Sequence, residues 1–249
     1  TEVTWDNLEA TDINGNAYAF TVKEVDAAGA DFTPENYGKA EVGLTVTNTY
    51  NIPTGSVTAA KAWVNGPATR PTVWFQLWRV RADVEGDTAV AVPGADIKEL
   101  QGGTTSVTWT AIETTDINGN PYTFTVKEVD AAGADFTPEN YKKAEDGLTV
   151  TNTYQIPTTG EATATKTWVN GPAEHPTVWF KLYRNIKGGA VQEVPMAQAP
   201  IQELQDGTTS VTWNNLEATD INGNPYTFTV KEVDAAGADF MPENYWKAE

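Results

Sequence analysis

An internal repeat of 104 residues constrains this chain more than any other feature. TDINGN begins at residues 11, 115 and 219, and TVKEVDAAGADF begins at 21, 125 and 229, so both motifs recur at one interval (115 − 11 and 219 − 115 are both 104). K-(A/T)-W-V-N-G-P-A begins at Lys61 and Lys166, and PTVWF follows each time. A period this long indicates a string of complete domains, not a solenoid whose units depend on their neighbours.

The repeat predicts one complete domain and two partial ones. The domains are the C-terminal part of a repeat at 1–52, a complete repeat at 57–154, and a repeat lacking its last strand at 162–249. The connectors NIPTGS and QIPTTGE are short and each carry one Pro and one Gly, which suits brief, semi-rigid joints. We expect the chain to be a segment of a longer linear array of such domains. Strand exchange between molecules is the less favoured alternative, because the first 43 residues would duplicate segments that 209–249 already supply.

Short alternating segments within the complete repeat predict an all-β fold. Strands are expected at 56–64, 71–80, 89–94, 105–112 and 122–129, with a final strand in GLTVTNTY. Asn118-Gly119 is a strong turn signal. The segment 130–146 is expected to be a long loop with one helical turn. Many short strands at this spacing indicate a β-sandwich of roughly 100 residues per repeat.

Composition excludes several classes of function. The net charge of −18 makes nucleic acid and anionic membrane surfaces poor partners. No apolar run reaches transmembrane length and no signal peptide is recognised, so membrane insertion of this segment is not expected. Cysteine is absent and His175 is the only histidine, which argues against disulfides and against Ser–His or His-ligated metal sites. A disulfide-free, Thr-rich, acidic β protein fits a secreted or surface protein.

The turn DINGN resembles part of a calcium loop, but its details argue against calcium. The glycine comes too early, and Lys127 occupies the twelfth position, where a bidentate glutamate belongs. No glycine-rich phosphate loop is present. We therefore expect no metal site and no cofactor.

Alternation places one polar residue on the apolar face of each of three strands. In LTVTNTY (148–154), Asn152 shares its face with the apolar residues at 148 and 150. Glu128 completes the face formed by residues 122, 124 and 126, and Lys61 lies between apolar residues at 59 and 63. Burial of a single lysine or glutamate is costly unless the group is paired or changes its protonation state.

Two interpretations of this trio follow from the residues alone, and both remain open. In one, Lys61 and Glu128 form a buried salt bridge with Asn152 as a hydrogen-bonding partner. In the other, burial lowers the pKa of the lysine and raises that of the acid, and the neutral amine attacks the carboxamide. The acid then polarises the carbonyl and carries protons to the departing ammonia, which leaves an isopeptide bond.

The repeat resembles the collagen-adhesin B-type (Cna-B) domain of Gram-positive surface proteins. The matching motifs are K-(A/T)-W, RPTVWFQL at 70–77, the Trp of SVTW, the D-x-NG turn, YTFTVKE and the closing LTVTNT, and they cover essentially the whole chain. His175 replaces the arginine of RPTVW in the third repeat. The resemblance implies tandem Greek-key, immunoglobulin-like sandwiches of about seven strands in two sheets, each with an autocatalytic Lys–Asn isopeptide bond.

Carried onto this sequence, the resemblance assigns roles within each repeat. In the middle repeat Lys61 is the nucleophile, Glu128 the catalytic acid and Asn152 the acceptor. The third repeat has Lys166 and Glu232, whose acceptor lies outside the fragment, and the first has Glu24 and Asn48, whose lysine lies outside it. Only the middle bond is expected to form within one complete repeat, and apart from this single-turnover reaction no enzymatic activity is expected.

The expected function is structural. We expect a stalk or pilus-like shaft on the outside of a Gram-positive cell, anchored to the wall through a region outside this fragment. Its partners would be neighbouring repeats and, through another domain, a host matrix protein or glycan. The alternative is an adhesin module that itself recognises such a ligand, and the outward aromatic residues Trp74 and Trp78 are candidates for it unless the 130–146 loop covers them.

Overall fold

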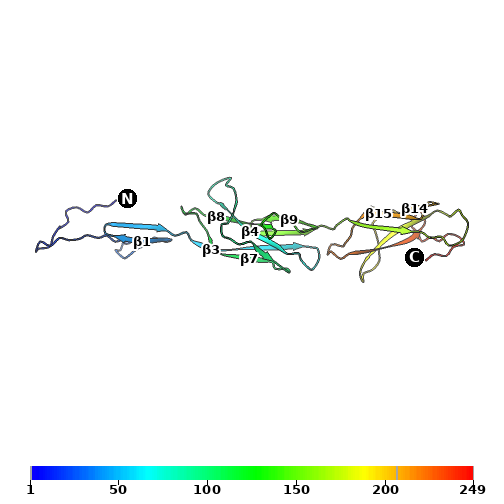
Figure 1. Cartoon of the computed structure of the whole chain (residues 1–249), viewed down its shortest axis with the longest axis horizontal. Coiled ribbons are helices and arrows are strands. Elements are labelled where there is room, and N and C mark those ends of the chain that lie inside the picture. Colours follow the sequence, from blue (N-terminus) through cyan, green and yellow to red (C-terminus); the bar gives the residue numbers. More distant parts are fainter. Residues whose placement is uncertain (1, 206, 249) are drawn as a thin grey trace. The chain divides into compact units, whose positions relative to one another are not determined.

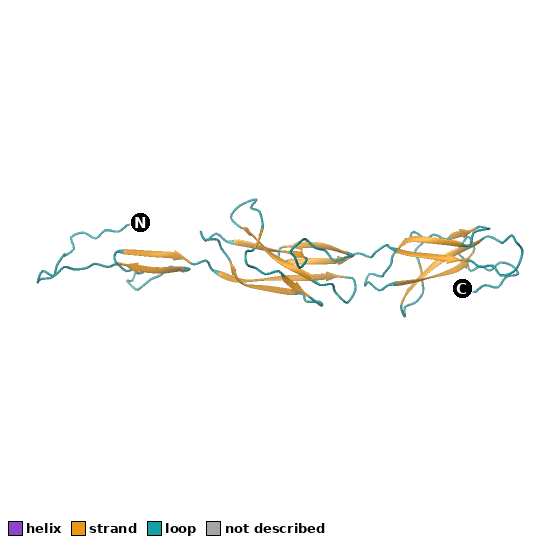
Figure 2. Ribbon diagram, in the orientation of Figure 1, coloured by secondary structure: helices purple, strands orange, loops and turns teal. Residues whose placement is uncertain are grey.

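The chain is built from strands and turns. The structure, a computed structural model, describes residues 2–205 and 207–248, and within them it contains sixteen strands and no α-helix (Figure 2). No helix with the length and apolar character needed to cross a membrane occurs among these residues. The all-β fold class predicted from the short alternating segments is therefore confirmed.

The middle repeat forms two sheets (Figure 1). One sheet has the order β7-β3-β10-β9, and the other has the order β5-β4-β6 with β8 paired to β4. The bounds are β3 Thr54–Val64, β4 Val73–Arg81, β5 Val90–Ala91, β6 Lys98–Leu100, β7 Ser106–Glu113, β8 Tyr122–Val129, β9 Tyr141–Asp146 and β10 Thr149–Tyr154. The first and last strands, β3 and β10, are parallel neighbours, with Lys61 opposite Val150 and Trp63 opposite Asn152.

Strand alternation fills the core of the middle repeat. Along β4, Val73, Phe75 and Leu77 are buried, while Trp74 and Trp78 on the opposite face are partly exposed. Facing strands contribute further buried side chains, because successive residues of a strand point to opposite faces. These are Val57, Ala59, Trp109, Ile112, Val126, Val129, Val150 and Tyr154.

The segment 130–146 differs from its prediction. Turns occupy residues 131–133 and 139–140, but the segment contains no helical turn, and Tyr141–Asp146 is the strand β9. Four of the six residues of β9 are charged, so the segment lacked the apolar alternation that marks a strand. Pairing with β10 through six residue pairs makes it a strand. The three-residue strand β6 was also missed.

The first and third repeats contain fewer strands. The first consists of the antiparallel pair β1 (Tyr37–Val42) and β2 (Thr45–Tyr50), preceded by turns and isolated bridges. In the third, β11 pairs with β15, and β12 pairs with β13, β14 and β16. Their bounds are β11 Gly160–Thr165, β12 Val178–Ile186, β13 Gln192–Glu193, β14 Gln202–Leu204, β15 Ser210–Leu216 and β16 Tyr226–Val233.

Backbone packing divides the chain into two compact units. The first comprises residues 1–57, 79–92 and 108–124, and the second comprises 58–78, 93–107 and 125–249. Lys61, Glu128 and Asn152 all belong to the second unit, so the site that they form lies within one compact body. The predicted repeat boundaries at 57–154 and 162–249 follow the sequence period and stay a prediction.

Candidate functional site

Three strands of the middle repeat carry the polar residues that alternation placed on apolar faces. Lys61 comes from β3, Glu128 from β8 and Asn152 from β10, and their exposed fractions are 4%, 0% and 0%. The remaining buried residues of this repeat are hydrophobic. The sequence therefore located three polar side chains of the core correctly, and the fold brings them together although 91 positions separate the first from the last (152 − 61).

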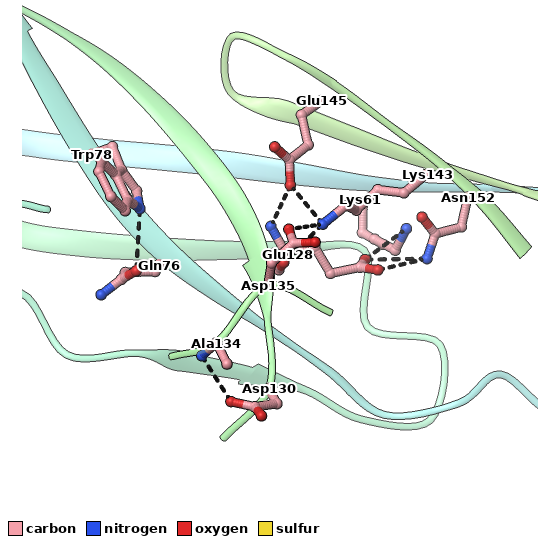
Figure 3. A network of polar contacts seen from close by, with 10 residues as sticks. All are labelled: Lys61, Gln76, Trp78, Glu128, Asp130, Ala134, Asp135, Lys143, Glu145 and Asn152. Atoms are coloured by element: carbon pink, nitrogen blue, oxygen red, sulfur yellow. Dashed lines mark hydrogen bonds and ion pairs between the residues drawn. The ribbon is translucent and has the colours of Figure 1, made fainter. Parts of the chain in front are cut away.

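The carboxylate of Glu128 lies between the other two groups (Figure 3). Lys61 Nζ is 3.1 Å from Glu128 Oε2, and Asn152 Nδ2 donates hydrogen bonds to Oε1 at 2.8 Å and to Oε2 at 3.2 Å. Both side chains of the ion pair are fully shielded from solvent. One acid thus contacts the amine that could attack and the amide nitrogen that could leave.

The surroundings of Lys61 favour its neutral form. Burial lowers the pKa of the Lys61 amine from its ordinary value of 10.5, although the charge and hydrogen bond of Glu128 oppose this and the nearby charge of Lys143 adds to it. The amine also lies 4.2 Å from the centre of the Trp63 ring and 3.4 Å from the Ala62 carbonyl oxygen, to which it donates. A lysine with a lowered pKa has a larger share of the nucleophilic free amine at neutral pH.

The carbonyl of Asn152 is the unusual group of the site. Among the described residues, Asn152 Oδ1 is buried and has no hydrogen-bond partner. Buried polar atoms normally find partners, so an unpaired carbonyl oxygen points to strain or to chemistry. The Glu128 carboxyl group accepts from the amide N–H groups of Asn152, which leaves the carbonyl oxygen of that amide without a partner.

The third repeat brings together two of the three groups. Lys166 Nζ and Glu232 Oε2 are 2.5 Å apart, but the lysine side chain is 15% exposed, whereas that of Lys61 is fully buried. Lys166 follows the last residue of β11 and lies 4.3 Å from the centre of the Trp168 ring, as Lys61 lies over Trp63. The third repeat thus has the same contact between lysine amine and carboxylate, but its lysine side chain is not fully shielded from solvent.

The first repeat brings together the complementary pair. Asn48 Nδ2 donates to Glu24 Oε1 at 3.0 Å and to Oε2 at 2.9 Å, with the asparagine exposed. The sequence of this repeat contains no lysine equivalent to Lys61 before Glu24. The predicted site residues therefore occur as one complete buried trio and two partial, more exposed pairs.

A second group of polar residues adjoins Glu128, and the sequence analysis did not find it. The main chain of Glu128 is hydrogen-bonded to Lys143 and Glu145 from β9, and Asp135 from the preceding loop pairs with Lys143 (Figure 3). These residues were assigned to the 130–146 loop. Tyr141, Lys143 and Glu145 alternate in sequence and recur in the other repeats, and this signal could have identified the strand.

The DINGN turn uses its aspartate internally. Asp116 accepts hydrogen bonds from the backbone N–H groups of Asn118 and Asn120 and from Asn120 Nδ2, all at 2.9 Å. These hydrogen bonds, the side-chain one from Asn120 first, hold the pKa of the Asp116 carboxyl below its usual range. No group of three or more metal-ligating side chains occurs within residues 2–205 and 207–248. The turn is thus accounted for as local structure.

One family model, one curated protein and one solved structure show what this chain is similar to. The model of the Cna protein B-type domain matches residues 1–49, 57–153 and 162–244. A collagen adhesin of Staphylococcus aureus is 36% identical over 151 residues, which make up 61% of this chain and 12% of that protein. The crystal structure of a single B repeat unit (B1) of the collagen-binding surface protein Cna of S. aureus is 22% identical, with a TM-score of 0.27 over 73% of this chain and 86% of that one. The family match covers most of the chain, and the chain belongs to the family of Cna protein B-type domains.

Proposed function

We propose that this chain is a stalk segment of a Gram-positive surface adhesin whose middle repeat is locked by an isopeptide bond between Lys61 and Asn152. The observation that carries the proposal is the solvent-free trio, in which the Glu128 carboxylate contacts both the amine and the amide nitrogen. Family membership supports an adhesin module and indicates no catalytic family. The relative spans far more than this chain, so its anchoring and ligand come to this protein only as proposals.

The reaction needs no reagent beyond the three side chains. The neutral Lys61 amine adds to Cγ of Asn152, and Glu128 takes a proton from the amine and passes it to the departing nitrogen. The C–N bond of the carboxamide breaks, the new amide C–N bond forms, and one ammonia leaves. Because the groups are fixed in contact, the attack gains the high effective concentration that free amides lack.

The geometry of the two joined strands gives the bond a mechanical purpose. β3 and β10 are parallel neighbours, so tension on Thr54 and Tyr154, at the outer ends of these strands, shears one strand past the other. A bond from Lys61 to Asn152 would carry that load directly and keep residues 62–151 off the load path. A covalent cross-link of this kind suits a cysteine-free protein, because an amide bond does not depend on redox conditions.

The proposed roles extend to the other repeats and to partners. We propose Glu232 and Glu24 as the corresponding acids, with Lys166 and Asn48 as the nucleophile and the acceptor of bonds completed by residues outside this chain. Repeats would occupy 1–52, 57–154 and 162–249, and each would have its neighbours as partners. A host matrix protein or glycan would be bound by another domain, at the surface of a cell to which a region outside this chain is anchored.

The alternative of a ligand-binding repeat receives less support from the outer face of β4. Lys127 Nζ lies 3.9 Å from the centre of the Trp78 ring, and Trp78 Nε1 donates to Gln76 Oε1 at 3.1 Å. The loop glycine Gly133 also lies close to Gln76. Neighbouring side chains thus partly occupy the aromatic face that a sugar would need.

Intact-mass measurement tests the cross-link directly. The purified chain should weigh one ammonia less than its sequence, and a proteolytic digest should contain a branched peptide that joins Lys61 to Asn152. Asn152→Ala should restore the full mass, whereas the matched change Asn48→Ala in the first repeat should leave the deficit unchanged. A chain with its full sequence mass would refute the cross-link.

A further inference from the structure

Both main-chain polar groups of Glu128 are hydrogen-bonded to side chains of β9. Glu128 N–H donates to Glu145 Oε1 at 2.9 Å, and Lys143 Nζ donates to the Glu128 carbonyl oxygen at 3.1 Å (Figure 3). Lys143 is itself paired with Asp135 at 2.6 Å and with Glu145 at 3.2 Å. These three residues, Asp135, Lys143 and Glu145, form what we call the backbone clamp.

The clamp supplies a partner that the sheet does not. Among the described residues β8 forms a continuous ladder only with β4, and its other edge has a single bridge, Val129 with Asp135, and a hydrogen bond from Val126 N–H to the Gly147 carbonyl oxygen, so no backbone carbonyl of a ladder accepts the N–H of Glu128. An unpaired N–H next to a buried carboxylate would be costly. The Glu145 carboxylate accepts a hydrogen bond from the N–H of Glu128. The Glu128 carbonyl oxygen accepts from Lys143 Nζ and also from the backbone N–H of Phe136, whose nitrogen lies 3.3 Å away.

The same clamp occurs in the first repeat. Glu24 N–H donates to Glu41 Oε1 at 2.9 Å, and Lys39 Nζ donates to the Glu24 carbonyl oxygen at 3.3 Å and to Asp31 at 2.7 Å. In the third repeat, Lys247 Nζ donates to the carbonyl oxygen of Glu232 at 3.3 Å and to Asp239 at 2.6 Å.

The first repeat shows that the clamp does not depend on the reactive lysine. It forms there although that repeat has no counterpart of Lys61 in this chain. The clamp is therefore a local feature of the segment that follows each acid, and it can set the position of the acid before the lysine strand packs against it.

We propose that Lys143 and Glu145 are positioning residues for the Lys61–Asn152 reaction, because they fix the main chain from which the Glu128 carboxylate reaches both reactants. The inference rests on the proposed function. Glu128 must stay within hydrogen-bond reach of Lys61 Nζ and Asn152 Nδ2 at once. A displacement of about 1 Å in such an arrangement can slow a reaction about a hundredfold.

The charge of Lys143 gives the clamp a second, measurable effect. Burial is the main reason why the pKa of Lys61 is lowered, and the positive charge of Lys143 lowers it further. The charges that act on Lys61 are those of Glu128 from β8 and Lys143 from β9, and Lys143 is itself paired with Asp135 and Glu145. The Arg70 guanidinium also lies over the Trp63 ring that Lys61 contacts. Although burial opposes it, hydrogen bonds to Asp135 and Glu145 raise the pKa of Lys143, so this lysine stays charged at neutral pH.

The rate of ammonia loss in the full chain tests the proposal. The chain is made in a brief cell-free synthesis, translation is stopped, and aliquots are moved to buffers from pH 6 to 9. Samples quenched in acid at intervals are then analysed by intact mass. Lys143→Met should slow the reaction about tenfold or more at pH 7 and move its pH profile toward higher pH, because the Lys61 amine would be protonated more often.

Two further variants separate positioning from general damage. Glu145→Gln keeps an oxygen that can accept from the Glu128 N–H, so it should slow the reaction less than Lys143→Met. Lys142→Met changes the exposed neighbour on the same strand and should leave the rate and the profile unchanged. Hydrogen exchange of β4 and β9 peptides checks that the middle repeat of each variant is folded.

The outcomes distinguish the two proposals. Ammonia loss in the unsubstituted chain with the same rate and pH profile in Lys143→Met and Glu145→Gln would overturn the positioning proposal alone. No ammonia loss in the unsubstituted chain would overturn the cross-link and the clamp together. If Lys143→Met fails to fold, Glu145→Leu takes its place, because it removes the acceptor of the Glu128 N–H, and an unchanged rate and profile in its folded chain overturns the positioning proposal.

Discussion

The middle and third repeats hold the same lysine–glutamate pair in different surroundings. Lys61 and Glu128 have fully buried side chains, whereas those of Lys166 and Glu232 are 15% and 3% exposed. The middle repeat has β10 beside β3, and β10 supplies Asn152 to the carboxylate. No described strand of the third repeat takes this place beside β11. The last strand therefore completes the reactive set and also removes it from water.

The first repeat completes this comparison. Its Glu24 and Asn48 make the same acid–amide hydrogen bonds without a lysine, while the third repeat makes the amine–acid contact without an asparagine. Each pairwise contact thus forms independently of the third group. Enclosure requires all three strands, and enclosure is what lowers the pKa of Lys61. Reactivity is therefore expected only where the sandwich is complete.

Lys61→Ala should give the largest loss of stability. It removes the proposed cross-link, which would close a loop of about 90 residues and contribute about 4–5 kcal/mol in the loop-entropy treatment used for disulfides. It also removes the Lys61 nitrogen that contacts the buried Glu128 carboxyl group, which costs about 1–3 kcal/mol more. Lys166→Ala should cost about 2 kcal/mol, because its pair is partly exposed and is not expected to be cross-linked within this chain.

Hydrogen exchange followed by mass spectrometry measures both changes within one chain. Peptides from β4 report on the middle repeat and peptides from β12 on the third, because the sequences of these two strands differ. Lys142→Ala, at an exposed position of β9, serves as the control and should alter neither. Equal losses of protection for Lys61→Ala and Lys166→Ala would contradict the view that only the middle pair is locked.

Extending the chain should convert the third repeat into a second middle repeat. The third repeat ends in KAE, which matches residues 143–145, so the segment DGLTVTNTY of residues 146–154 can be appended after Glu249. The mass deficit should then rise from one ammonia to two, and the third repeat should gain about 4 kcal/mol of stability. A matched extension with alanine in place of its asparagine should keep the deficit at one.

If the extended chain does not lose a second ammonia, the proposed reaction needs more than the three residues and their burial. If the extended third repeat gains hydrogen-exchange protection but loses no ammonia, enclosure of Lys166 is not sufficient for the reaction. Differences near the pair would then become decisive. The clearest of these is His175, which stacks on Trp168 at 4.7 Å, whereas the corresponding Arg70 lies over Trp63 with its Cζ 5.6 Å from the ring centre.

The three buried polar residues could be predicted because strand alternation is a local signal. Lys61, Glu128 and Asn152 each interrupt an otherwise apolar face, and a period of two places them inward. Their mutual contact required more, because the parallel pairing of β3 with β10 joins the two ends of a repeat. No local pattern encodes that pairing, and the family resemblance supplied only the expected association of Lys61, Glu128 and Asn152.

The strand β9 shows where local signals fail. Lys143 and Glu145 lie on a face that contacts polar main-chain atoms of Glu128, so charge was selected where alternation would look for apolar residues. The three-residue strand β6 was missed because it is too short for any period to show. Predictions from pattern were thus reliable where a face meets the hydrophobic core, and they failed where a strand serves hydrogen bonding.

The smallest expected effect is a pH dependence that distinguishes a free Lys61 from a cross-linked one. In Asn152→Ala the bond cannot form, so Lys61 remains an amine whose pKa burial lowers below its ordinary 10.5. Between the folded and the unfolded pKa the unfolded chain binds more protons, so the free energy of unfolding should rise with pH across this window and level off above about 10.4. In the unsubstituted chain the proposed bond would make this nitrogen an amide, which adds no such slope.

Urea unfolding between pH 7 and 10.5 measures this slope, with the double variant Lys61→Met/Asn152→Ala as the reference. Other titrating groups contribute equally to both chains, so the difference between the two curves isolates Lys61. The change should be smaller than the loss of the cross-link itself, because Glu128 opposes the effect of burial. Parallel curves would mean that burial does not favour the free amine, and the step in which Lys61 attacks as a neutral nucleophile would then need another base.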